Sequence, residues 1–165
     1  MTEDLRNELS QALDRYDARR NADVARQKKL RDDDALFLAR FAELRRDVVR
    51  PVFEEAGALL AARGHTFAIV EEEFVAAAGA VRVREARITL SIAPAGMGPP
   101  LHPNGYERAL SITTRHYEKT VFISSGRPPD TGGVAGAKGA YPIERVDRQL
   151  VEAEVVKLVR AVMES

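Results

Sequence analysis

Residues 87–92, with the sequence RITLSI, decide the fold because polar and apolar residues alternate strictly along them. Residues 109–113 (ALSIT) repeat this alternation, and residues 120–124 (TVFIS) follow mostly the same pattern. Alternation at period two is typical of a strand with one buried and one exposed face. We therefore predict three antiparallel strands whose apolar side chains point to the core: Ile88, Leu90, Ile92, Leu110, Ile112, Val121 and Ile123.

The opposite face of this sheet carries hydroxyl and guanidinium groups and is predicted to meet water. Thr and Ser suit exposed strand positions, so a solvated face without function is the first interpretation. A binding surface is the alternative, because Arg recognises phosphate and carboxylate groups and an aromatic ring can stack on a base. Contact with another subunit is a third interpretation. The candidate ligand-binding residues on this face are Arg87, Thr89, Ser111, Thr113, Arg115 and Phe122.

Two helices are predicted to cover the apolar face of the sheet. Residues 35–63 carry a broad apolar stripe at helical spacing, which includes Leu59. Pro51 interrupts this stripe, so either the helix kinks there or a new helix begins. Residues 147–163 form a closing helix that Asp147 caps, and its apolar stripe is expected to pack beside the first helix on the same sheet face.

Residues 1–34 are predicted to form a helical arm, partly disordered if it has no partner. They contain no Gly or Pro, and Asp32–Asp34 either cap a new helical segment or lie inside one long helix. An apolar stripe at spacings of three and four occupies the first turns and then fades. A stripe exposed on a lone arm is an unusual loss of burial, so we predict an oligomer interface there. Its residues are Leu5, Leu9, Ala12, Leu13 and Tyr16.

The middle of the arm is strongly basic. Between Arg15 and Arg31 there are seven basic residues against Asp17 and Asp23. A solvated, salt-bridged helix surface is the usual meaning of such a run, and phosphate contact is the alternative. The whole chain carries 25 basic and 25 acidic residues, which argues against a dedicated nucleic-acid binder. The candidate nucleic-acid contacts are Arg19, Arg20, Arg26, Lys28, Lys29 and Arg31.

Residues 125–140 are rich in Gly and Pro and are predicted to be a long loop. Glycines together with Lys138, a further candidate ligand-binding residue, resemble a phosphate cradle in composition. A P-loop needs Ser or Thr after its Lys, whereas Gly139 follows here. A connector is therefore the favoured interpretation, and a small enzyme with its site in this loop is an alternative. Residues 74–83 are Ala-rich and fit a short helix or a loose strand equally well.

The histidines have no spacing typical of a metal site or a catalytic motif. A nucleophile–base pair would need His116 and Glu118 to meet Ser124 or Ser125 in space, which the spacing does not require. No catalytic residue is therefore predicted. The three histidines are His65, His102 and His116.

Metal and thiol chemistry have little support in the composition. There is no Cys, which excludes disulfides and thiolate sites. Glu71 and Glu73 would project together from an extended strand, but one carboxylate pair without a third ligand is a weak metal signal. No metal or cofactor is predicted. The absence of a long apolar run or a signal-like N-terminus predicts a cytoplasmic protein, and frequent Ala and Arg suggest a bacterial source.

The prediction for the fold is α+β: a long N-terminal helical arm followed by a four- or five-stranded antiparallel sheet packed on one face by two helices. The compact domain covers residues 35–165, with strands within 65–124 and 141–146. The leading hypothesis for function is a non-enzymatic oligomerisation or adaptor protein that assembles through the arm, with itself or with a helical partner. Alternatives are an anion- or nucleic-acid-binding module and the small enzyme.

Overall fold

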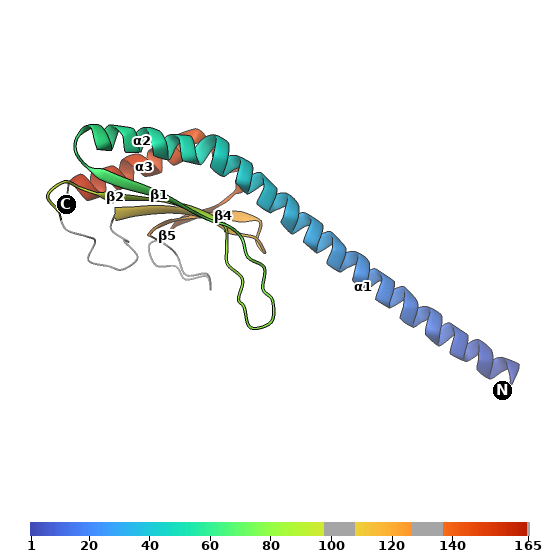
Figure 1. Cartoon of the computed structure of the whole chain (residues 1–165). Helices are drawn as coiled ribbons and strands as arrows, with labels where there is room; N and C mark the ends of the chain where they lie inside the picture. The colour runs from blue at the N-terminus through green and yellow to red at the C-terminus, as the bar shows by residue number, and fades with distance from the viewer. Residues whose placement is uncertain (98–107, 127–136, 165) are drawn as a thin grey trace. The chain divides into compact units, whose positions relative to one another are not determined.

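A computed structural model describes residues 1–97, 108–126 and 137–164 of the chain. The chain divides into two compact units, residues 1–36 and residues 37–165. Unit 1 is the helical arm, and unit 2 is an α+β domain (Figure 1). The helices are α1 (Glu3–Leu44), α2 (Arg50–Ala62) and α3 (Arg148–Met163). The strands are β1 (Thr66–Glu72), β2 (Arg87–Ala93), β3 (Ala109–Arg115), β4 (Thr120–Ser125) and β5 (Ala137–Pro142).

The strands of the described residues form one antiparallel sheet in the order β1-β2-β3-β4-β5. In this sheet Ile88 pairs with Ile112, and Ile112 pairs with Ile123, so the apolar positions of three strands share one face. All seven residues predicted for the core are at most 2% exposed. The predicted strand alternation and fold class are therefore confirmed.

Helices α2 and α3 lie on the same side of the sheet (Figure 1). Phe53 and Leu60 of α2 and Val151 and Val155 of α3 join the sheet residues in one apolar core. Asp147 caps α3 as predicted, because its carboxylate accepts a hydrogen bond from the Leu150 N–H at 2.8 Å. The expected helix layer is thus confirmed.

The long helix changes its hydrogen-bond pattern before Pro51. Helix α1 runs without a break through Asp32–Asp34, so these residues lie inside one helix and do not cap a new one. A π-helical segment, Arg45–Val49, follows, and the N–H of Arg50 bonds to the carbonyl of Arg45. Pro51 then falls in the first turn of α2, directly after the π-helical segment.

Two segments differ from the prediction. Residues 74–83 form neither a helix nor a regular strand: they extend the β1–β2 hairpin through bridges between Val75 and Arg84 and between Ala78 and Val81. Strand β5 occupies residues 137–142, whereas a loop was expected to residue 140 and a strand over 141–146. Gly139 has a φ of +145° and stands at a register shift in the β4–β5 pairing. Backbone pairing with β4 thus outweighs a Gly-rich composition that indicates a turn.

Helix α2 approaches β1 closely at Gly57. A Cβ atom added at Gly57 would lie 2.4 Å from the Phe67 ring, well inside contact distance. We expect Gly57→Ala to lower the free energy of unfolding by up to about 2 kcal/mol, because overpacking outweighs the better helix propensity of Ala. Thermal or urea unfolding measures the change.

A double-mutant cycle isolates the cause of that loss. In a Phe67→Ala background the clash is removed, so Gly57→Ala should become stabilising by up to about 1 kcal/mol. The same destabilisation in both backgrounds would show that the Phe67 ring is not the obstacle.

Candidate functional site

The polar sheet face is buried at its centre, contrary to the prediction that it meets water. Arg87, Ser111, Thr113 and Phe122 are buried, whereas Thr89 and Arg115 are half-buried. Period-two alternation shows which residues share a face but not whether that face is covered. The six candidate residues therefore lie on a face that is buried or half-buried rather than open to water.

The polar groups of this face contact one another. Arg87 Nε lies 2.8 Å from a carboxylate oxygen of Glu72, which is its register partner on β1. The hydroxyls of Thr89 and Ser111 are 2.8 Å apart, again between paired residues. The Arg115 guanidinium stacks over Phe122, 4.0 Å from the ring centroid. These contacts stabilise the sheet from within, and the ligand-binding role of the six residues stays a prediction.

Lys138 does not lie in a loop. It stands on β5, and its ammonium is 3.6 Å from a carboxylate oxygen of Glu154, a buried residue of α3. Lys157 approaches the other oxygen of Glu154 at 3.2 Å. Two cations around one buried carboxylate form an ion-pair cluster that ties β5 to α3. Gly139 of the predicted cradle also stands on β5, whereas Gly132, Gly133 and Gly136 lie outside the described part of the chain.

His116 has a carboxylate partner, and it is Glu85 rather than the Glu118 that a nucleophile–base pair would have needed. The buried carboxylate of Glu85 contacts His116 Nδ1 and accepts a hydrogen bond from the His116 N–H at 3.2 Å. The Thr114 hydroxyl donates to the same carboxylate at 3.1 Å and accepts from the Ala86 N–H at 3.0 Å. This cluster closes the base of the extended hairpin against the β3–β4 turn, and it unites residues that no sequence spacing links.

The remaining histidines do not join this cluster. His65 Nδ1 accepts a hydrogen bond from the Ala95 N–H at 3.0 Å, and His102 lies outside the described residues. Ser124 instead donates to the carbonyl of Gly126 at 3.3 Å. The structure therefore does not bring His116, Glu118 and Ser124 together.

Glu71 and Glu73 bind a cation that the chain itself supplies. The guanidinium of Arg45, in the π-helical segment, lies 2.6 Å from Glu73 and 3.8 Å from Glu71. It also donates to the carbonyls of Glu72 and Arg87, at 3.3 and 3.4 Å. Arg45 thus joins the end of the long helix to strands β1 and β2. Within the described residues, no group of three or more acidic or histidine side chains is placed to hold a metal ion.

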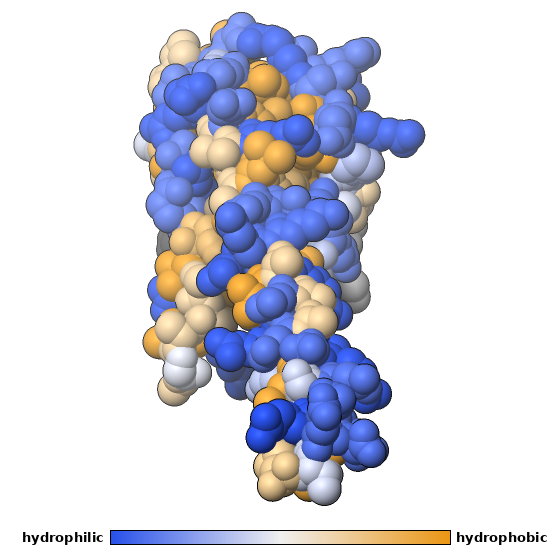
Figure 2. All heavy atoms as spheres, turned by 90° about the vertical axis from the view of Figure 1, so that its right-hand side faces the viewer, coloured by the Kyte–Doolittle hydropathy of each residue, from blue (hydrophilic) through white to orange (hydrophobic). Residues whose placement is uncertain are grey.

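The arm exposes its apolar stripe. Leu5, Leu9, Leu13 and Tyr16 are each between 49% and 56% exposed, and Ala12 is exposed as well. At about 100° per residue, all of the stripe except Leu13 lies within a band of about 60°. The space-filling view shows apolar residues, in orange, interspersed among polar ones in blue (Figure 2). The first turns of the arm thus expose an apolar stripe that no residue of the same helix covers.

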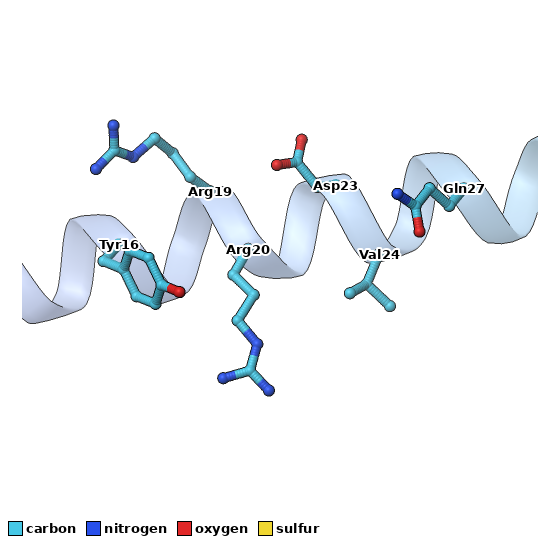
Figure 3. Close-up of a pocket in the computed structure, with 6 residues that line it drawn as sticks. All are labelled: Tyr16, Arg19, Arg20, Asp23, Val24 and Gln27. Carbon is cyan, nitrogen blue, oxygen red and sulfur yellow. The ribbon is translucent and has the colours of Figure 1, made fainter.

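The basic residues of the arm do not form one track. Arg19 and Asp23 project to one side of the helix, whereas Arg20 and Val24 project to the other (Figure 3). By helical spacing, Arg26 shares the side of Arg19 and Arg31 shares the side of Arg20, whereas Lys28 and Lys29 point in two further directions. Arg26 is paired with Asp23. The hollow drawn in Figure 3 lies between side chains of a single helix, so it does not enclose a ligand.

An apolar groove lies between α2 and α3, and the sequence analysis missed it. Its volume is about 720 Å³, and Leu59, Val156 and Met163 are exposed along it. Leu59 was predicted to belong to the buried stripe but is 70% exposed, because Leu60 takes the core position beside it. A second apolar line in α3, at positions 156, 159 and 163, is the signal that could have revealed the groove.

The edge of this groove is basic. Arg63 and Arg160 belong to its lining, and neither guanidinium pairs with a carboxylate among the described residues. One ion pair joins the same helices at the start of α3 instead, where Arg148 contacts Glu55 at 2.6 Å, and Arg148 also contacts Glu152 within α3 at 2.6 Å. The hydrogen bonds to Glu55 and to Glu152 raise the pKa of Arg148. The groove is therefore apolar in its floor and positively charged at its edge.

Comparisons with protein-family models, with curated proteins and with solved structures found no match to this chain. Along the described part of the chain, no helix has both the length and the apolar content needed to cross a membrane. Inference about function therefore depends on the surfaces of the chain itself.

Proposed function

We propose that this chain is a cytoplasmic, non-enzymatic assembly protein whose N-terminal arm joins it to further copies of itself. The observation that carries the proposal is the exposed stripe of Leu5, Leu9, Ala12, Leu13 and Tyr16 on a helix with no buried residue before Phe37. Isolated helices are marginally stable, and most helical stability in proteins comes from packing an apolar face. A second chain supplies that packing.

The alternatives have less support. An adaptor role with a different helical protein would use the same stripe, and a second copy is the simpler partner because it is always present. Nucleic-acid binding by the arm stays a prediction, since its cations face both sides of the helix and none of their geometry favours a phosphate backbone. An enzyme in residues 125–140 stays a prediction as well, because most of that stretch lies outside the described residues.

Charge placed in the stripe tests the proposal. We expect the full chain to form a dimer or larger species in light scattering or sedimentation, and the double variant Leu5→Glu/Leu9→Glu to be monomeric at the same concentration. Charged side chains cannot enter an apolar interface without a large desolvation cost. Both positions are exposed, so unit 2 should stay folded in both proteins, and any difference in unfolding temperature should vary with protein concentration.

Asn7→Glu/Gln11→Glu is the matched control, because it adds the same charge on the opposite side of the same turns. This variant should keep the mass of the unmodified chain. A monomeric full chain, or an assembled Leu5→Glu/Leu9→Glu variant, would contradict the proposal.

A further inference from the structure

Acidic and basic side chains are segregated along the length of the arm. Residues 1–14 carry four carboxylate side chains, those of Glu3, Asp4, Glu8 and Asp14, against the single guanidinium of Arg6. Residues 15–31 carry seven basic side chains against two acidic ones. The tip, residues 3–16, therefore combines the apolar stripe with four acidic side chains against the two basic ones of Arg6 and Arg15, whereas the stem, residues 17–31, has six basic side chains against two acidic ones and little apolar surface.

This division argues against pairing of one arm with another. In a parallel pair, acidic tips would meet acidic tips and basic stems would meet basic stems, which is repulsive. In an antiparallel pair the charges would match, but the apolar stripe of each tip would lie against a polar stem. A coiled coil needs a sustained apolar seam on both helices, and neither arrangement supplies one.

The groove between α2 and α3 provides an apolar, basic surface for the tip, which a second arm does not. Its floor is apolar, with Leu59, Val156 and Met163 exposed, and Arg63 and Arg160 stand at its edge without a carboxylate partner among the described residues. An amphipathic helix laid into an apolar groove is a common mode of recognition, read through residues at spacings of three and four. Asp4 and Glu8 flank the stripe on the tip, so acidic side chains would face the basic edge.

We infer that the tip of one chain docks in the α2/α3 groove of a second chain. The inference rests on the proposed function and names the surface that receives the arm. The contact joins unlike surfaces of two identical chains. If two chains each place their tip in the groove of the other, a closed dimer forms. If each tip enters the groove of a further chain, longer assemblies form. In both cases each tip occupies one groove.

A complementation experiment tests the docking on full-length chains. Leu5→Glu/Leu9→Glu damages the tip and leaves the groove intact, and Leu59→Glu/Val156→Glu damages the groove and leaves the tip intact. All four positions are at least 47% exposed, so both variants should fold. We expect each variant alone to be monomeric in sedimentation velocity, with the Kd for assembly weakened by about 100-fold or more. Mixed in equal amounts, they should form a complex of two chains, because one intact tip meets one intact groove.

Each other outcome decides a different point. A tip variant that is monomeric beside a groove variant that assembles normally would overturn the docking site and keep arm-mediated assembly. Two monomeric variants that stay monomeric when mixed would also overturn the docking site. A tip variant that still assembles, or an unmodified chain that is monomeric, would overturn the proposed function itself.

Charge reversal provides an independent check on the same contact. Arg63→Glu/Arg160→Glu should weaken assembly by about tenfold, and adding Asp4→Arg/Glu8→Arg to the partner chain should restore it. Restored assembly of this charge-reversed pair would support docking of the tip in the groove. Assembly of every variant with the affinity of the unmodified chain would contradict a role of these charges in docking.

Discussion

Replacing Phe53 by Ala lowers the free energy of unfolding of unit 2 by about 3–5 kcal/mol, the largest loss that we expect from one side chain. Phe53 is fully buried where α2 packs on the sheet and on α3. The substitution removes the transfer free energy of the ring and leaves a cavity that close-packed neighbours fill only in part. Because small domains have total stabilities of about 5–15 kcal/mol, the variant should lie close to the threshold of folding.

Urea unfolding followed by circular dichroism measures this loss. Phe53→Leu keeps most of the buried volume and should cost about 1.5 kcal/mol or less, so it remains measurable if Phe53→Ala does not fold. Tyr117→Ala is the control for removing an exposed aromatic ring and should cost less than about 1 kcal/mol. Comparable losses at Phe53 and Tyr117 would show that α2 does not hold the core together. Measurement at two protein concentrations separates folding from assembly.

Replacing Arg45 by Ala is expected to cost about 2–3 kcal/mol. The guanidinium is 9% exposed and donates to two backbone carbonyls as well as to Glu73. Its loss removes the hydrogen bonds to those two carbonyls and the packing against Phe41, over whose ring it lies at 5.8 Å. The loss stays below the ~3–5 kcal/mol typical of a broken buried ion pair because Glu71 keeps Arg50 at 3.2 Å and Glu73 can turn to water.

Arg46 supplies the matched control for Arg45. It is the next residue along the helix, is largely exposed, and pairs with Asp47 at 2.8 Å. Arg46→Ala should leave the unfolding transition unchanged, because exposed ion pairs contribute little. Arg45→Lys keeps the charge but loses the planar guanidinium that donates several hydrogen bonds at once. The stability of this variant should therefore fall between those of the unmodified chain and Arg45→Ala. Equal stability of Arg45→Ala and Arg46→Ala would mean that the π-helical segment does not depend on this contact.

The expected losses at Phe53 and Arg45 both concern the stability of unit 2 and do not depend on the arm. The core residues named above belong to unit 2, whereas the stripe from Leu5 to Tyr16 contributes no buried side chain. Substitutions in the stripe should therefore leave the fold of unit 2 intact and alter its unfolding only through the concentration-dependent stabilisation that assembly adds, whereas core substitutions should lower its stability at every concentration. This separation makes the assembly experiments interpretable.

Local pattern determined much of the architecture. The alternation in residues 87–92 assigned Ile88, Leu90 and Ile92 to the core because a strand turns successive side chains to opposite faces. The cap at Asp147 could be predicted for a similar reason, since a helix leaves N–H groups unbonded within its own first turn. The exposed stripe on the arm is visible in the same way. Each of these features involves residues only a few positions apart.

Tertiary structure alone decided the features that join distant residues. Glu85 meets His116 and Arg45 meets Glu73 because the strand order and the helix layer bring them together, and no spacing in the sequence encodes either pair. The same holds for Leu59 and Val156, which become one apolar groove only when α2 and α3 pack on one sheet face. Periodicity reports which residues share a face, whereas burial and pairing depend on what the rest of the fold places against that face.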